Sequence, residues 1–192
     1  MELLALMKSR RAIRKYQDQQ VLKADMEKII EAGTYAPSAG GGQRSMIVGL
    51  RDRALIERLG RMNLAHFDRS CLSGGFVSRE QPSVIDDPSI RSGFYGAPAL
   101  CVIFAQKGFL YSVPDAFCCA ENMVLMASSM GIASCIVARA EETFDCDEGR
   151  ALLASWGVPE NYIARCFVTL GYCDGEIPPP KPRMANRSKI IE

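Results

Sequence analysis

The stretch ALCVIFA, residues 99–105, decides the fold because its seven apolar residues follow one another without a polar break. The run is too short for a typical helix, and it lies between Pro98 and Gln106. A strand that is apolar at every position, rather than at every second one, is buried on both faces. We therefore expect a central strand at 99–105 that is covered by further structure on each side.

Helices and strands alternate on both sides of this run. Before it, the hydrophobic spacing predicts a helix over 23–35, a strand over 45–50 and a helix over 53–61. After it, the predicted elements are a long helix over 113–130 that is enclosed on most sides, a strand over 132–138, a helix over 141–155 and a strand over 163–172. This order predicts an α+β fold, with α/β-like alternation, in which helices flank a mixed central sheet.

Residues 65–96 are the least regular part of the sequence. They are rich in Ser, Gly, Asp and Pro, and we interpret them as a lid or an insertion. The Pro-rich, basic segment 177–187 is expected to run extended. The length of the chain and the lack of an internal repeat favour a single domain over 1–192.

The composition is that of an ordinary folded, soluble protein, with 48% apolar and 23% charged residues. A net charge of +1 gives no electrostatic reason to expect nucleic acid or an anionic membrane as a partner. The longest uncharged run, 122–138, is shorter than the ~20 residues of a membrane span. The apolar run at the N-terminus is too short for a signal peptide, so we expect a cytoplasmic protein.

The eight cysteines do not form a metal-binding or disulfide pattern. No two are spaced as C-x-x-C, and the single histidine, His66, leaves a structural zinc site without its usual ligands. Several cysteines lie inside apolar runs, where a thiol behaves as a small hydrophobic group. We expect most of them to be buried and free, and we expect no metal.

Several familiar catalytic motifs are missing from the sequence. The three glycines at 40–42 are not followed by the Lys and Ser or Thr of a phosphate loop. No G-x-G-x-x-G motif supports a dinucleotide-binding fold, and no G-x-S-x-G motif supports a hydrolase triad.

Three polar clusters remain, and each has an ordinary structural explanation when it is taken alone. They are SRRAIRKY at 9–16, PSAGGGQR at 37–44 and PPPKPR at 178–183. The arginines of the first suit the negative C-terminal end of a short helix. The glycines of the second suit a flexible loop, and the third suits a solvated basic tail.

The order and spacing of the clusters nevertheless resemble the nitroreductase family of FMN-dependent oxidoreductases. The matching motifs are an Arg-rich turn after a short first helix, P-S-x-x-x-x-Q after the second helix, Y-G-A-P before the buried strand, M-G-I-A-S-C at the end of the long helix, and L-G-Y followed by K-P-R. The resemblance covers nearly the whole chain and is vague between about 65 and 93. It implies a homodimer with two FMN sites at the subunit interface, NADH or NADPH as the reductant, and a small-molecule electron acceptor.

The resemblance implies that the basic clusters near both ends of the chain converge on the phosphate of the flavin nucleotide. Arg10 and Arg11 match positions that contact the ribityl chain and phosphate, and Lys181 and Arg183 match further phosphate contacts. Guanidinium groups suit this task because they donate paired hydrogen bonds to phosphate oxygens. Ala12 stands where the family often has serine, so one hydroxyl contact is expected to be missing.

Arg14 is the residue that we expect to matter most for catalysis. It matches a basic position beside the pyrimidine edge of the flavin, where a fixed positive charge favours the acceptance of hydride at the flavin N5 atom. The sequence assigns no side chain as a general acid or base.

The glycine loop matches positions that line the flavin from the second subunit. The matching residues are Pro37, Ser38, Ala39, Gly41 and Gln43, and Gly41 stands where many members carry asparagine. The loss of that side chain favours close approach of the backbone to the ring or the ribityl chain, rather than a phosphate cradle. A merely flexible loop is the alternative.

The segment after the long helix matches the chain that passes the other flavin edge. The residues are Ile136, Val137, Ala138 and Arg139, of which the last two depart from the glycine or acid that many members have. Because the expected contact is a backbone N–H, cofactor binding tolerates this departure. Asn63 is a further candidate, as an amide beside the pyrimidine.

The resemblance implies an FMN-dependent enzyme that takes hydride from NADH or NADPH and reduces an organic acceptor, such as a nitroaromatic or a quinone, by a ping-pong mechanism. One alternative is a flavin enzyme of the same fold with another redox task, such as reductive dehalogenation or the oxidation of a bound intermediate. A second is an FMN-binding module without turnover.

Overall fold

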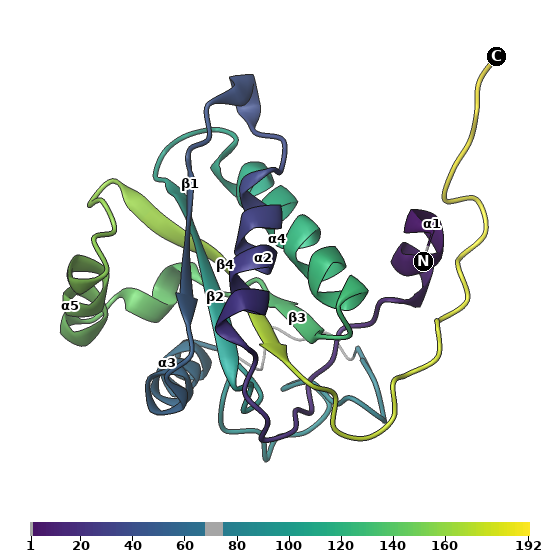
Figure 1. The fold of residues 1–192 in the computed structure, drawn as a ribbon, viewed down its shortest axis with the longest axis horizontal. Coiled ribbons are helices and arrows are strands. Elements are labelled where there is room, and N and C mark those ends of the chain that lie inside the picture. Colours follow the sequence, from purple (N-terminus) through teal and green to yellow (C-terminus); the bar gives the residue numbers. More distant parts are fainter. Residues whose placement is uncertain (1, 68–74) are drawn as a thin grey trace.

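A four-stranded sheet in the order β1-β2-β4-β3 forms the centre of the computed structural model, which describes residues 2–67 and 75–192 (Figure 1). The strands are β1 (Ser45–Leu50), β2 (Ala99–Gln106), β3 (Ala133–Val137) and β4 (Tyr162–Gly171). Each neighbouring pair of these strands is antiparallel. The parallel pairing that a mixed sheet requires is confined to an isolated bridge between Ala12 and Ser134, where the N-terminal segment runs beside β3.

Helices cover both faces of the sheet, which confirms the predicted α+β class. The helices are α1 (Leu3–Ser9), α2 (Lys23–Thr34), α3 (Arg53–Ala65), α4 (Ser112–Ser129) and α5 (Asp147–Ser155), with short 3-10 turns η1 (Ala39–Gly41) and η3 (Glu141–Phe144). Figure 1 shows α2 and α4 together on one face, and α3 and α5 on the other. Among residues 2–67 and 75–192, no helix combines the length and the apolar character that a bilayer crossing requires.

Strand β2 is buried on both faces, as its sequence predicts. From Ala99 to Ala105, its odd-numbered residues belong to the apolar cluster formed with α2 and α4, and its even-numbered residues belong to the cluster formed with α3, η3 and α5. Every residue from Ala99 to Ala105 is at most 1% exposed. Alternation on a pleated strand therefore divides one continuous apolar run between two hydrophobic cores.

The helix pair α2 and α4 packs closely because Gly33 lies at the contact. A Cβ atom added to Gly33 would lie 2.8 Å from Ile47 Cδ1 and 2.8 Å from Met123 Cγ. Helix α4 buries Ala116, Ala120 and Met123 on this side. It is thus enclosed by α2 and by the sheet, as expected for the predicted helix over 113–130.

A bulge interrupts the pairing of β2 with β4. Ile103 pairs with Cys166, but Phe104 pairs with Ala164, so Arg165 is the extra residue. The bulge directs the Arg165 side chain to Ser112 at the start of α4, with Nε donating to Oγ at 2.9 Å, and to Glu141 of η3 in an ion pair.

The predicted helix over 141–155 is divided into η3 and α5 at Asp145 and Cys146. Gly149 packs so closely on Phe144 that an added Cβ would lie 2.5 Å from the Phe144 carbonyl oxygen. The Cys146 Sγ atom accepts a hydrogen bond from Gly149 N, so Cys146 caps the N-terminus of α5.

The seven cysteines that the structure describes are free thiols. Cys101, Cys119, Cys135 and Cys166 are buried, and Cys118, Cys146 and Cys173 are partly exposed. Burial raises the pKa of Cys101 to about 12, and burial followed by the neighbouring Cys119 raises that of Cys166 to about 12. Cys71 lies outside the described residues.

Candidate functional site

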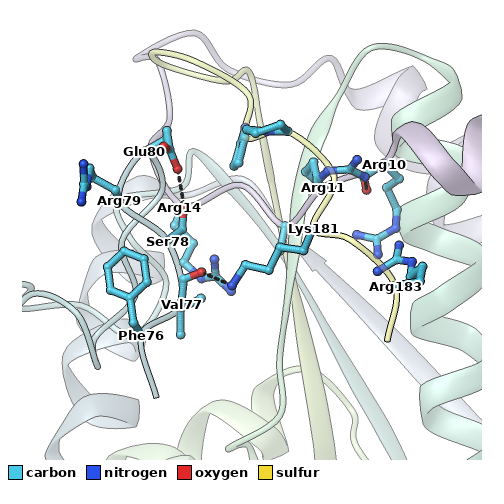
Figure 2. Close-up of a pocket in the computed structure, with 13 residues that line it drawn as sticks. Arg10, Arg11, Arg14, Phe76, Val77, Ser78, Arg79, Glu80, Lys181 and Arg183 are labelled. Atoms are coloured by element: carbon cyan, nitrogen blue, oxygen red, sulfur yellow. Dashed lines mark hydrogen bonds between the residues drawn. The ribbon is translucent and has the colours of Figure 1, made fainter. Parts of the chain in front are cut away.

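A pocket of about 500 Å³ lies where segments from before and after the sheet meet (Figure 2). Its walls come from three parts of the chain: residues 10–14, residues 76–80 and residues 178–183. The lining residues are Arg10, Arg11, Ala12, Arg14, Phe76, Val77, Ser78, Arg79, Glu80, Pro178, Pro179, Lys181 and Arg183. The structure therefore brings together the first and third basic clusters that the sequence singled out.

Backbone hydrogen bonds to the sheet edge position the N-terminal arginines. Helix α1 ends at Ser9, and the chain then runs beside β3, where Ile13 N donates to Ser134 O at 3.0 Å. A second bridge joins Tyr16 to Cys173, just after β4. The chain before the sheet and the chain after it are thereby fixed side by side.

The pocket is strongly cationic in a chain of net charge +1. Six of its lining residues are Arg or Lys, and one, Glu80, is acidic. Partial burial, followed by the neighbouring guanidinium groups of Arg183 and Arg10, lowers the pKa of Arg11. Figure 2 shows Arg10, Arg11 and Arg183 close together on one side of the pocket. Like charges at such short range repel one another, so the arrangement favours the binding of an anion.

Arg11 carries a further sign of an anion site. Its Nη1 atom donates to Lys8 O at 2.8 Å and to Arg10 O at 2.6 Å. Its Nε atom is buried and finds no hydrogen-bond partner within the described part of the chain. A buried donor without a partner is costly, and an anionic ligand in the pocket would supply the missing acceptor.

Arg14 is held at the wall between this pocket and a second cavity of about 320 Å³. Its backbone N donates to Gln81 Oε1 at 2.7 Å, and its Nη1 donates to Gln81 O at 3.4 Å. Its guanidinium carbon lies 5.9 Å from the centroid of the Tyr95 ring. These contacts restrict Arg14 to one place beside the pocket.

Gln81 is a residue of the site that the sequence did not reveal. It is 0% exposed and contacts both the N-terminal segment and the chain after β4. A glutamine within an irregular, polar segment carries no periodic or motif signal that would distinguish it from a solvated one.

Asp86 fixes the wall formed by residues 76–80. Its carboxylate accepts hydrogen bonds from Val77 N at 2.7 Å, Ser78 N at 3.3 Å, and Ser83 N and Oγ at 2.8 and 3.1 Å. Desolvation alone would raise the pKa of Asp86, but these donors together hold the pKa below its ordinary value. Lys181 is tied to the same wall, with Nζ donating to Val77 O at 2.7 Å.

The glycine loop does not reach this pocket within one chain. It follows α2 and lies at the far end of that helix from the N-terminal segment (Figure 1). Ala39 N donates to Asp115 Oδ1 at 3.1 Å, and Gln43 N donates to Ser38 Oγ at 3.0 Å. Gly40 and Gly41 have φ angles of +61° and +62°, with open space where a Cβ would be. The structure thus separates Pro37, Ser38, Ala39, Gly41 and Gln43 from the basic cluster.

The segment after β3 forms a third group. Ile136 and Val137 end the strand, and Ala138 and Arg139 line a cavity of about 260 Å³ together with Asn63. Asn63 is 2% exposed, and its Nδ2 donates to Arg139 O and, at 3.0 Å, to Thr143 Oγ1. Its amide is therefore committed to holding this segment. Burial lowers the pKa of Arg139, whose guanidinium carbon lies 3.9 Å from the Phe67 ring centroid.

Comparisons of the sequence and of the fold with known proteins give matches in the same family. A model of the family described as "Nitroreductase family" matches residues 7–172. A solved structure described as a nitroreductase with bound FMN, from Bacteroides fragilis, is 30% identical, with a TM-score of 0.82 and full coverage of both chains. A similar structure from Desulfitobacterium hafniense, also described as a nitroreductase with bound FMN, shares the fold at a TM-score of 0.80, 22% identity and full coverage of both chains. An Archaeoglobus fulgidus protein, provisionally named an NADH dehydrogenase/NAD(P)H nitroreductase, is 27% identical over 89% of this chain and 85% of its own.

Proposed function

The chain belongs to the nitroreductase family, and on that premise we propose that it is an FMN-dependent oxidoreductase. It takes hydride from NADH or NADPH and passes electrons to an organic acceptor, such as a nitroaromatic or a quinone, in a ping-pong sequence. The observation that carries the proposal is the cationic pocket, which is lined by arginines and a lysine from chain segments before and after the sheet. Arg11 Nε is buried there and has no hydrogen-bond partner among the described residues.

The pocket fits the phosphate end of FMN. Its volume of about 500 Å³ lies within the ~300–1,000 Å³ that is usual for small-molecule sites. A bound phosphate would give the Arg11 Nε its acceptor. It would also offset the repulsion from Arg183 and Arg10, which together with burial, the larger cause, lowers the Arg11 pKa. The residues that we propose to hold the phosphate are Arg10, Arg11, Lys181 and Arg183.

Bound FMN supplies the two-electron chemistry, and the protein supplies its position and electrostatic surroundings. Arg14 contributes a fixed positive charge, since its contacts with Gln81 and its place beside Tyr95 hold it at the pocket wall. We propose that this charge lies beside the pyrimidine end of the cofactor, where it stabilises the negative charge that accompanies hydride acceptance. Arg14 therefore acts through electrostatics, without transferring a proton.

The end of β3 and the chain after it are proposed to pass the other edge of the cofactor and to present a backbone N–H near Val137, Ala138 or Arg139. Because the Asn63 amide is bonded to Arg139 O and Thr143 Oγ1, we assign Asn63 the task of holding this segment in place. The departures at Ala138 and Arg139 are compatible with this arrangement, since the backbone makes the contact.

We propose that two copies of the chain share each site. The glycine loop lies away from the pocket of its own chain, and the open space at Gly41 leaves its backbone free to approach a ligand held by another copy. Helix α1 exposes Leu3, Leu4 and Met7 by 60%, 53% and 44%, which is apolar surface that a second copy would cover.

Visible absorption of the purified protein tests the proposed function. We expect the protein to retain FMN, to lose the oxidised-flavin absorption when NADH or NADPH is added without oxygen, and to recover it when a quinone or a nitroaromatic follows. Retained flavin that neither nucleotide reduces would favour the binding module. Failure to bind added FMN would contradict the proposal altogether.

A further inference from the structure

The side-chain amide of Gln81 lies behind the cationic pocket and contacts two segments that are far apart in sequence. Gln81 is 0% exposed. Its Oε1 atom accepts hydrogen bonds from Arg14 N and Lys15 N, both at 2.7 Å. Its Nε2 atom donates to Asp174 O and Glu176 O, both at 3.3 Å, and lies 3.7 Å from Cys173 Sγ.

The two ends of this amide therefore bind different segments of the chain. The oxygen faces two backbone donors of the N-terminal segment, and the nitrogen faces backbone acceptors of the chain after β4. If the amide were reversed, its NH₂ would face donors and its oxygen would face acceptors, so the contacts define its orientation. A buried amide with both ends satisfied is a rigid link.

This link is the point at which the C-terminal segment leaves the body of the molecule. Up to Asp174 the chain is held by the N-terminal segment, since Asp174 N donates to Lys15 O at 2.9 Å. Beyond Gly175, two hydrogen bonds connect the segment to other described residues: Gln81 Nε2 to Glu176 O, and Lys181 Nζ to Val77 O. The second of these involves the exposed side chain of Lys181. A phosphate in the pocket would compete with Val77 O for this donor.

We propose that Gln81 is the positioning residue that couples the two halves of the anion site. It fixes Arg14 on one side and directs the chain that carries Lys181 and Arg183 on the other, so that cations from both segments converge on one ligand. The identity of that ligand as the FMN phosphate rests on the proposed function above. Without the link, the interaction of Lys181 Nζ with Val77 O would be the one remaining hydrogen bond to other described residues that holds the segment beyond Gly175.

The proposal predicts thermodynamic coupling between Gln81 and Arg183. In the otherwise unchanged protein, Arg183→Ala is expected to weaken FMN binding by about tenfold to a hundredfold, since it removes a charge-assisted contact. In a Gln81→Leu background, the same change is expected to weaken binding by less than about threefold, because Arg183 is already displaced. Titration of the apoprotein with FMN, followed by flavin fluorescence, measures all four affinities.

Gln20 provides a matched control. Its Nε2 donates to Arg51 O at 3.0 Å and to Pro98 O at 2.9 Å, so it also links separate segments, but none of these residues lines the pocket. Its Oε1 accepts from the neighbouring Val21 N at 2.9 Å. Gln20→Leu is expected to lower the stability and to leave the full effect of Arg183→Ala intact. If Gln81→Leu and Arg183→Ala are additive, or if Gln20→Leu couples to Arg183 equally strongly, Gln81 has no positioning role.

Hydrogen exchange of the apoprotein tests the same link without flavin. A Gln81→Glu variant keeps an acceptor for Arg14 N and Lys15 N but has no donor for the C-terminal segment. It is therefore expected to retain slow exchange at those two amides while proteolysis after Asp174 becomes faster. If the parent protein binds no FMN, the proposed function fails, whereas this comparison still decides the role of Gln81. Unchanged proteolysis would overturn the inference.

Discussion

At Gly41 the backbone conformation, rather than packing against neighbouring side chains, favours glycine. Its φ of +62° lies in the left-handed region, and apart from its two chain neighbours no described residue has an atom within 4 Å of where a Cβ would be. Asparagine tolerates this region better than most residues. We therefore expect Gly41→Asn to change the free energy of unfolding by less than about 0.5 kcal/mol and Gly41→Val to lower it by more than about 1 kcal/mol, as measured by urea denaturation.

Gly33 is the comparison that separates backbone conformation from packing. There a Cβ would meet Ile47 and Met123 at 2.8 Å, so Gly33→Ala is expected to cost ~1–3 kcal/mol through overpacking. If Gly41→Asn and Gly33→Ala lowered the free energy of unfolding equally, the result would show that the glycine loop packs against something that one chain does not contain.

Arg14 is expected to set the reduction potential of the bound flavin more than the affinity for it. Arg14→Ala leaves the proposed phosphate contacts in place, so the protein should keep much of its FMN. Loss of a fixed positive charge beside the cofactor lowers its potential, and ~1.4 kcal/mol corresponds to about 30 mV for a two-electron couple. A dye-equilibrated titration of the parent and the variant measures this shift. An unchanged potential with weakened binding would make Arg14 an anchor only.

At the scale of secondary-structure elements, Arg165 lies at the β-bulge and connects three elements. It belongs to β4, bonds Ser112 at the start of α4 and pairs with Glu141 of η3, with its side chain 11% exposed. Hydrogen bonds that involve charged groups contribute ~1.5–3 kcal/mol, and we expect Arg165→Ala to lower the free energy of unfolding by that amount. Arg150, which is 64% exposed and pairs with the fully exposed Asp147, is the control that should change it little.

The segment containing Asp86 should loosen in acid. Because the pKa of Asp86 is lower in the folded protein than in the unfolded chain, its contribution to stability is present above the ordinary pKa of ~3.9 and is lost as the pH falls through the lower folded value. As the pH falls from the ordinary pKa of Asp86 through its lower folded value, we expect pepsin to cut near residues 76–87 more readily. Asp86→Asn should be cut more readily than the parent at pH 5, and the difference should vanish in stronger acid.

The elements with continuous or periodic apolar patterns could be predicted from sequence, and those decided by single contacts could not. ALCVIFA predicts β2 because every position is buried. The division between η3 and α5 depends on the contact of Gly149 with Phe144, and the bulge at Arg165 depends on partners in other elements. The same distinction holds in the site. The two basic clusters were recognisable in the sequence, and residues of both line one pocket in the structure, whereas Gln81 became visible only through its contacts.

At the scale of the whole molecule, the arrangement predicts that the protein sediments as a dimer at micromolar concentration. Two features support the proposed second copy: the apolar side chains exposed on α1, and the distance of the glycine loop from the pocket of its own chain. Replacing Leu4 with Lys, on the exposed face of α1, should shift the equilibrium towards monomer. A compact monomer for the unmodified chain under the same conditions would contradict the shared site.

The pocket draws on chain that precedes the whole sheet and chain that follows it, and this has a consequence for the order of events during synthesis. Arg11 leaves the ribosome early, but Arg183 follows only after all four strands have been made. Contacts between residues so far apart in sequence form late in folding, after the more local pairings are in place. If the pocket holds the cofactor phosphate, as proposed, the nascent chain is expected to retain the cofactor there only after all four strands and the segment that follows them have been made.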